Sequence, residues 1–515
     1  MKTVVLSISA ALASFIVQPA FAQTQPNIAA PPAGASAATG GEIQQLQTLH
    51  GKFPEPSGQD TGGPQPPTIL QQLDTETDDE GQVSTYQPGG QTVTASNPFF
   101  RVLGTNGRTC FTCHQLTDGM GLGQANATNR FAADPNEPLF RLVDGATCPD
   151  DDVSTPAAMA QAYSLLTAKG LIRINLPLSS SFQFQIVNVQ DTNGSDCNTN
   201  PNTGVTGPQS GAVNFYRRPL PATNLGSESN IMWDAREPSL AHQALDATLG
   251  HAQASVTPAD PLLNQIVSFE SGLYDAQSFD TGLAGISVAG AGDLTGADGS
   301  GATGGAQTLA QTIANFVTGI NDPFGGNFNP AIFNIYDAWA NLTGTDPTTQ
   351  ARQAIYRGEQ VFNTAPMQIT GVAGLNDVQG KPTITGTCGT CHSDPNVGNA
   401  SSNVTMDTGV TDASPPPPDL DISGLPVFTV LCTAGPDAGQ TFTVTDIGVG
   451  MISGQCADIG KTKVPAIRGI AARSPYFHNG AALEITNLVQ FYNARFNMNL
   501  TAQQQSDLEV FLEAQ

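Results

Sequence analysis

Two short runs of the chain carry cysteine and histidine at a spacing that can attach a prosthetic group. "GRTCFTCHQ" (107–115) and "GTCGTCHSD" (386–394) each hold two cysteines three residues apart, with a histidine directly after the second. A C-x-x-C-H run is typical of covalent c-type haem, in which two thioethers hold the porphyrin and the histidine is an axial ligand of the iron. We therefore expect two covalently bound haem c groups. Their predicted binding residues are Cys110, Cys113 and His114 for the first, and Cys388, Cys391 and His392 for the second.

Two other kinds of cysteine chemistry compete with this interpretation. A zinc site would bring both C-x-x-C pairs to one ion, but it leaves the two histidines that follow them unexplained. A thioredoxin-like redox motif needs a βαβ context, and none is visible around either run. Haem attachment is the interpretation that uses all six residues.

The other four cysteines are Cys148, Cys197, Cys432 and Cys456. In an oxidising compartment they most simply form two disulfides. The pairing expected from their positions is 148–197 and 432–456, although the sequence alone does not fix the connectivity.

The N-terminus predicts export. One lysine precedes an apolar run, and "AFA" provides small residues at a cleavage position, which is typical of a signal peptide, here over residues 1–22. The run is shorter than the roughly 20 residues needed to span a bilayer, and no later segment is long and apolar enough to do so. We expect a periplasmic protein with no membrane span.

The charge balance excludes one class of partner. A formal net charge of −25 argues against nucleic acid, whose phosphates require basic patches. It would attract a basic protein partner, or serve solubility alone. The 54 glycines and 37 prolines with only 12% charged residues predict long irregular loops around a modest helical core.

Local patterns divide the rest of the chain. Residues 23–95 are rich in Pro, Gly, Gln and Thr and predict a mostly irregular arm, and the Gly/Ala run 282–307 predicts a loop. Apolar residues at helical spacing predict helices at 240–249, 348–364, 484–496 and 501–514. Alternation predicts strands at 181–189, 425–432 and 440–446, the last two as an antiparallel pair. The resulting expectation is a mainly α protein with two cytochrome c-type haem domains, 96–345 and 346–515, carrying long loop and β-hairpin insertions.

Two further segments carry a family resemblance. "WDAREPSLAHQA" (233–244) and "KTKVPAIRGIAARSPYFHNGAALEITNLVQFYN" (461–493), in order with the two haem motifs, resemble the bacterial di-haem cytochrome c peroxidase/MauG family over about residues 96–515. The resemblance implies a haem-dependent peroxidase or oxidase in which the N-terminal haem reacts with hydrogen peroxide. The C-terminal haem would then store or relay electrons, with Trp233 carrying them between the two. The implied partner is a small redox protein (a cytochrome c or cupredoxin) or a protein substrate.

The resemblance also marks residues around the first haem. No histidine lies in the segment after His114, through residue 135, so the sixth iron position is expected to be open to peroxide. The family's catalytic glutamate lies twenty residues after the tryptophan, where this chain has Gln253. Glutamine can donate a hydrogen bond to peroxide but cannot take its proton. Either His251, two residues earlier, supplies the base, or turnover is slower and differently directed. His251 could equally be a structural cap. His242, on the same helix, is expected to face solvent.

For the second haem the resemblance places a sixth ligand at Tyr492. The alternative is that Tyr492 belongs to the core and a methionine binds the iron; the candidates are Met406, Met451 and Met498. His478 is expected to brace a propionate or the domain contact. Lys463 and Arg468 are expected to pair with propionates or to be solvated.

Two implications of the resemblance remain open. The family binds calcium between its domains through an asparagine and backbone carbonyls, but that position holds Arg218, which would repel the ion. Calcium is therefore disfavoured. The alternative function is a non-enzymatic di-haem electron-transfer cytochrome, in which both irons have six ligands and do not react with peroxide.

Overall fold

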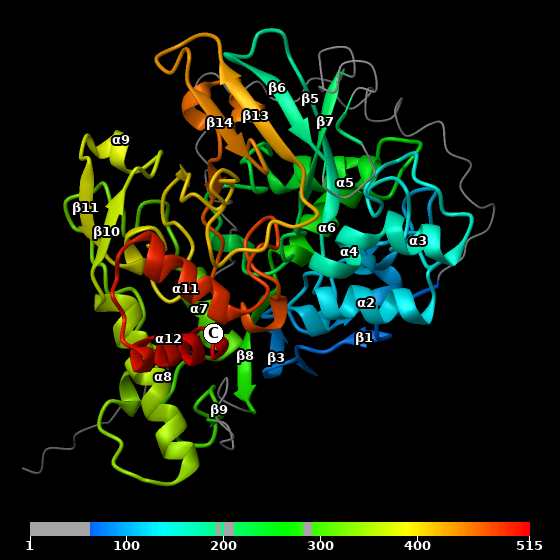
Figure 1. The fold of residues 1–515 in the computed structure, drawn as a ribbon. Helices are drawn as coiled ribbons and strands as arrows, with labels where there is room; N and C mark the ends of the chain where they lie inside the picture. The colour runs from blue at the N-terminus through cyan, green and yellow to red at the C-terminus, as the bar shows by residue number, and fades with distance from the viewer. Residues whose placement is uncertain (1–61, 192–196, 200–210, 282–290) are drawn as a thin grey trace, which may run out of the picture.

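A computed structural model describes residues 62–191, 197–199, 211–281 and 291–515 (Figure 1). The predicted signal peptide and the first part of the predicted arm lie outside these ranges. The described residues form eleven α-helices and fifteen strands in six small sheets. The prediction of a mainly α fold is therefore wrong, because segments before, between and after the two C-x-x-C-H runs pair into sheets.

The helices predicted from apolar spacing are present. α8 (Pro347–Thr364) begins after Asp346, whose side chain accepts a hydrogen bond from the Thr349 amide, and α12 (Ala502–Glu513) begins at a capping box on Thr501. α8 and α12 pack closely at Gly358, where a Cβ would collide with the carbonyl oxygen of Asp507. Only glycine allows this close approach. α11 (Ile485–Arg495) packs on α12 and completes the core behind the second C-x-x-C-H run.

The other helices are shorter. α5 (Leu240–Gly250) is capped at its N-terminus by the Ser239 hydroxyl, and α6 (Asp260–Glu270) follows it. The remaining helices are α2 (Gln124–Ala133), α3 (Pro156–Ala162), α4 (Ser164–Lys169), α7 (Ala306–Ile313), α9 (Asn376–Gln379) and α10 (Gly450–Ser453).

Part of the segment predicted to be irregular forms strands. β2 (Leu73–Thr77) and β3 (Gly81–Tyr86) form a hairpin, and β3 pairs with β8 (Tyr274–Asp280) in a four-stranded antiparallel sheet that ends at β9 (Gly292–Asp293). The expectation of irregular structure is wrong for this stretch. Polar and charged residues dominate these strands, so they lack the apolar alternation that marks a strand. Pairing with β8 fixes their position.

A second sheet joins segments that are far apart in the sequence. β6 (Phe184–Gln190) pairs with β13 (Val427–Cys432), which pairs with β14 (Thr441–Val444) (Figure 1). The β13–β14 hairpin was predicted; the β6–β13 pairing was not. Inward side chains of this sheet form a separate core with those of β5 (Ile172–Pro177) and β7 (Ala212–Arg217). The remaining strands are β1 (Ile69–Leu70), β4 (Thr92–Val93), β10 (Met367–Thr370), β11 (Thr383–Gly386), β12 (Thr405–Met406) and β15 (Thr462–Lys463).

Both predicted disulfides are confirmed. Cys148 is bonded to Cys197 and Cys432 to Cys456, with Cα–Cα distances of 5.4 and 6.0 Å. The second ties β13 to the turn that precedes β15. Four cysteines remain free, and they are those of the two C-x-x-C-H runs.

A buried ion network links the two halves of the chain. The Arg217 guanidinium donates to Asp234 at 2.5 Å and to Asp446 at 2.6 Å, and all three side chains are at most 3% exposed. Burial alone would raise the pKa of Asp234, but Arg236 and Arg217 hold it at about 2. Within the described ranges, no helix is both long and apolar enough to cross a bilayer.

Candidate functional site

The two C-x-x-C-H runs adopt the same local structure. In each, a threonine precedes the first cysteine and another precedes the second, so both read T-C-x-T-C-H. The amide of the first threonine donates to the hydroxyl of the second, Thr109 to Thr112 and Thr387 to Thr390, at 3.0 Å in both cases. The histidine amide donates back to the carbonyl of the first cysteine. This turn brings two thiols and an imidazole onto the wall of one cavity.

Each histidine is held in one orientation by a backbone carbonyl six residues downstream. His114 Nδ1 donates to the Met120 carbonyl at 2.8 Å, and His392 Nδ1 donates to the Gly398 carbonyl at 2.5 Å. Both carbonyl residues have positive φ, 56° and 80°. Burial lowers the pKa of both histidines, so the rings are neutral and the Nε2 lone pair is left free to bind a metal. The Met120 side chain packs in the core and does not line the cavity.

The cavities fit haem c better than the alternatives. Each C-x-x-C-H run lines a cavity of its own with largely apolar surroundings, as a porphyrin requires. Each cavity has its own C-x-x-C pair, so the pairs do not converge on one zinc ion. Burial raises the pKa of the Cys388 and Cys391 thiols to about 12, which disfavours a thiolate redox pair.

A histidine supported by a buried ion pair lines the first cavity. His251 Nδ1 donates to Asp144 Oδ2 at 2.5 Å, and Asp144 Oδ1 accepts from Arg108 at 2.5 Å. Burial alone would raise the pKa of Asp144, but Arg108 and the hydrogen bond from His251 hold it well below its usual range. An ionised Asp144 only accepts hydrogen bonds, so His251 Nδ1 carries the proton of this bond and Nε2 is left for the cavity. All three residues line the cavity, and His251 is 38% exposed.

The other predicted residue on this side does not reach the cavity. α5 ends at Gly250, and Gln253 has a positive φ of 54°, so its side chain leaves the line of the helix. Gln253 does not line the first cavity, and its carbonyl accepts from the Thr105 hydroxyl instead. We assign it no role.

Sequence reasoning missed Glu270 at the end of α6. Ile266 and Glu270 are one helical turn apart and both line the first cavity. The Glu270 side chain is buried, and its Oε2 has no hydrogen-bond partner in the described part of the chain. Burial raises its pKa to about 8, so the carboxyl group is neutral at pH 7. One sequence signal was available: an acidic residue at the end of an otherwise apolar helical face (Leu263, Ile266, Phe269).

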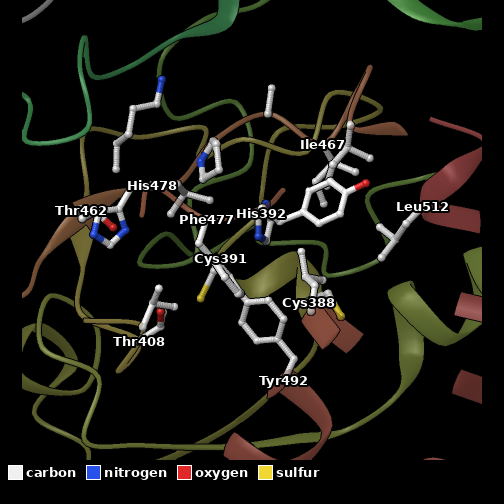
Figure 2. Close-up of a pocket in the computed structure, with 18 of the residues that line it drawn as sticks. Cys388, Cys391, His392, Thr408, Thr462, Ile467, Phe477, His478, Tyr492 and Leu512 are labelled. Carbon is white, nitrogen blue, oxygen red and sulfur yellow. The ribbon is translucent and has the colours of Figure 1, made fainter. Parts of the chain in front are cut away.

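Tyr492 and two of the three methionine candidates line the second cavity. Figure 2 shows Tyr492 extending from α11 towards Cys391, and Met406 and Met498 are also in the lining. Met451 is not; it packs in the separate core beneath β13. The structure thus leaves the sixth-ligand candidates at Tyr492, Met406 and Met498.

One wall separates the two cavities. Pro219, Leu220, Pro221, Glu228 and Lys463 line both. Lys463 was predicted to pair with a propionate, but its Nζ donates to Glu228 at 2.5 Å. Arg468 lines neither cavity, which does not fit pairing with a propionate. It is 1% exposed and donates to backbone carbonyls, which does not fit a solvated role.

Trp233 lies on the second-cavity side of this wall. Its Nε1 donates to the Arg218 carbonyl at 2.8 Å, and its ring centroid is 6.0 Å from that of His478. The preceding residue, Met232, lines the first cavity. His478 also lines the second cavity (Figure 2), and burial lowers its pKa to about 4, so its imidazole is neutral.

The Arg218 guanidinium fills a cluster of carbonyls between the halves. It donates to the carbonyls of Leu122 (2.7 Å), Arg473 and Pro475, and it is 8% exposed. These oxygens are the kind of ligand that calcium takes. A fixed positive charge among them opposes a second cation, in line with the expectation that calcium is disfavoured.

Comparisons with known proteins add little. Neither a family model nor a curated protein sequence matches the chain. Among solved structures, a MauG-like protein associated with microbial copper homeostasis is 14% identical, with 59% of this chain and 74% of that chain covered and a TM-score of 0.30. At these values the likeness establishes neither a common fold nor a function.

Proposed function

We propose that the chain is an exported, periplasmic di-haem oxidoreductase of the cytochrome c peroxidase/MauG type that reduces hydrogen peroxide at the Cys110–His114 site. The observation that carries the proposal is the pair of identical T-C-x-T-C-H turns on adjoining cavities, each with its histidine Nδ1 bonded to a carbonyl. Bound haem supplies iron that exchanges electrons with peroxide. An electron donor or oxidisable substrate provides two electrons, and with two protons one peroxide becomes two waters.

His251 moves the proton in this proposal. In this role His251 Nε2 would take a proton from one peroxide oxygen and return it to the other, which leaves as water as the O–O bond breaks. Asp144 holds the ring and stabilises the imidazolium that forms transiently, and Arg108 keeps Asp144 ionised. Glu270, neutral at pH 7, carries a further proton on the same cavity. Electrons would pass across the shared wall through Trp233, which lines the second cavity next to Met232 on the first.

One observation favours the second candidate, an electron-transfer cytochrome. Met232 lines the first cavity, and thioether sulfur is a familiar axial ligand of haem iron. If Met232 or His251 closes the sixth position, peroxide has no place to bind.

The EPR spectrum of the ferric holoprotein separates the two. We expect one high-spin and one low-spin haem, and loss of the high-spin signal within seconds of adding one equivalent of peroxide. Tyr492→Phe should alter only the low-spin signal if Tyr492 is the second ligand. Two low-spin haems that do not respond to peroxide would refute the peroxidase proposal and favour electron transfer.

A further inference from the structure

A second group of metal-ligand side chains lies at the start of α5. Ser239 caps the helix through the His242 amide, so His242 and Asp246 lie one turn apart on the same face. Glu237 precedes the cap and is fixed by a backbone bridge to Ile231. His242 was expected to face solvent, but its side chain is 25% exposed because it turns back onto Glu237.

The three side chains converge. His242 Nδ1 is 2.6 Å from Glu237 Oε2 and 3.9 Å from Asp246 Oδ2. One potential ligand atom from each residue lies within 4.8 Å of those of the other two. Atoms bound to one first-row ion at about 2.0–2.2 Å lie at most about 4.4 Å apart. Small side-chain rotations would therefore bring all three onto one ion.

The charges around this group favour a cation. Arg236 is the nearest arginine, but its Nη1 donates to both oxygens of Asp234, at 2.9 and 3.1 Å, and its Nε is 3.8 Å from Glu237. Arg217 is likewise taken up by Asp234 and Asp446. These two arginines and two aspartates balance, so the charges left for Glu237 and Asp246 are the imidazole and, for Glu237, the more distant Arg236 Nε.

One carboxylate oxygen of the group is also unsatisfied. Asp246 Oδ1 is buried and has no hydrogen-bond partner among the described residues, and the Glu237 side chain is 4% exposed. A buried acceptor left without a partner destabilises the fold. A bound ion with its water ligands would satisfy it.

Two of the three residues line a cleft that shares residues with the first cavity. Glu237 and Asp246 line this cleft, of about 660 Å³, and Asp144 and His251 line both the cleft and the first cavity. Arg173 also lines it, but its guanidinium donates to Asn214 and to the carbonyls of Leu142 and Val143. An ion held here would be beside the wall that carries His251.

We propose that Glu237, His242 and Asp246 bind one divalent first-row transition-metal ion of the Mn²⁺ or Zn²⁺ class. One imidazole with two carboxylates suits such ions better than Cu⁺, which prefers sulfur, or Ca²⁺, which takes six to eight oxygens. Three protein ligands leave positions for water, so the site is open to exchange from the cleft. The site is distinct from the C-x-x-C-H residues and does not depend on the peroxidase proposal.

Manganese titration of the holoprotein tests the site. Free Mn²⁺ gives a six-line EPR spectrum at room temperature, and its amplitude falls as the ion binds to the protein. We expect this loss to saturate at one ion per chain. His242→Gln and Asp246→Asn should each weaken binding at least about 10-fold. Two matched variants should bind as the parent does: Asp260→Asn, an exposed acid at the start of α6, and His251→Gln, a neighbouring histidine outside the group.

Competition provides a second measurement that needs no variant. Zn²⁺ should displace Mn²⁺ at lower concentration, as the usual order of divalent affinities requires, while equal Mg²⁺ should not. Weak binding of many ions, or binding that survives both ligand substitutions, would overturn the proposal and assign the uptake to the acidic surface. If His251→Gln loses peroxide reactivity but keeps Mn²⁺ binding, the two sites are independent.

Discussion

Replacing Glu270 by glutamine should stabilise the protein, and more so as the pH rises. The carboxyl group is buried at the end of α6, on the wall of the first cavity, with Oε2 unpartnered in the described part of the chain. Glutamine has nearly the same shape but never ionises. The substitution therefore removes the titration and leaves the packing on Ile266 and Phe269 in place.

The size of the effect follows from the two pKa values. Burial raises the pKa of Glu270 from 4.5 to about 8. Between these values the unfolded chain binds fewer protons than the folded one at this position, so stability falls as pH rises from 4.5 to 8. With 1.36 kcal/mol for each pKa unit, the folded protein loses about 1 kcal/mol at pH 5 and about 3 kcal/mol at pH 7. Glu270→Gln should recover these amounts.

Urea unfolding of the holoprotein at pH 5 and pH 7, followed by circular dichroism, measures the difference. The gain of the variant over the parent should be larger at pH 7 by about 2 kcal/mol. Asp79→Asn, on an exposed turn, should give the same small effect at both pH values. An equal effect of Glu270→Gln at both pH values would mean that Glu270 is ionised in the folded protein and has a partner, which refutes the reasoning.

Three further substitutions test other parts of the structure. His251→Gln should slow the reaction with peroxide about 10²- to 10⁴-fold in stopped-flow absorbance without changing the ferric spectrum; an unchanged rate would remove His251 from the mechanism. Arg218→Gln leaves carbonyls between the halves without donors and should lower the free energy of unfolding in urea by at least about 2 kcal/mol. Added calcium should not stabilise the parent. Stabilisation by calcium would contradict the assignment of this carbonyl cluster to the Arg218 guanidinium. Cys432→Ser opens a loop with a sequence separation of 24 to Cys456 and should cost about 3 kcal/mol in the same assay; a loss below about 1 kcal/mol would show that the β13 sheet does not need the bond.

The features that the sequence predicts well depend on short-range patterns. The T-C-x-T-C-H turns are closed by hydrogen bonds between residues three apart, so composition and spacing specify them without help from the rest of the fold. The helix at 347–364 has a capping residue, a proline at its first position and a regular apolar face. The β13–β14 hairpin is likewise local. Each of these features depends on neighbours in the chain, and for that reason the residue pattern alone predicts it.

Long-range pairing leaves no such pattern. β6 and β13 are more than 200 residues apart, and nothing in either strand identifies the other as its partner. β2 and β3 contain few apolar residues and form strands because β8 pairs with β3. β6 and β13 were predicted as strands but not as partners, whereas β2 and β3 lie where an irregular arm was expected. The resulting sheets are the reason why the mainly α prediction failed.

Position along the chain selected one residue that does not line the first cavity, for a geometric reason. Counting from Trp233 selected Gln253, but α5 ends at Gly250, and the backbone turns at Gln253 through a positive φ. His251, still in helical conformation at the end of α5, keeps its side chain on the cavity. The point at which the helical conformation ends therefore decides which side chain faces the cavity. His251 faces it, and Gln253, two residues later, does not. Glu270 escaped notice because burial and lack of a partner are properties of the packed fold.

The wall between the cavities explains why the two sites should act as one unit. Lys463 and Glu228 line both cavities, and their charges cancel at 2.5 Å. A buried ion pair of this kind adds little net electric field to either cavity. Loss of one partner would leave an unpaired buried charge beside both cavities. Trp233 sits on the same wall, with its indole N–H bound to the Arg218 carbonyl and its backbone carbonyl accepting from the Lys463 amide. The residue proposed to carry electrons and the charge pair beside it are thus fixed by one piece of backbone. Anything that shifts this wall changes both cavities together.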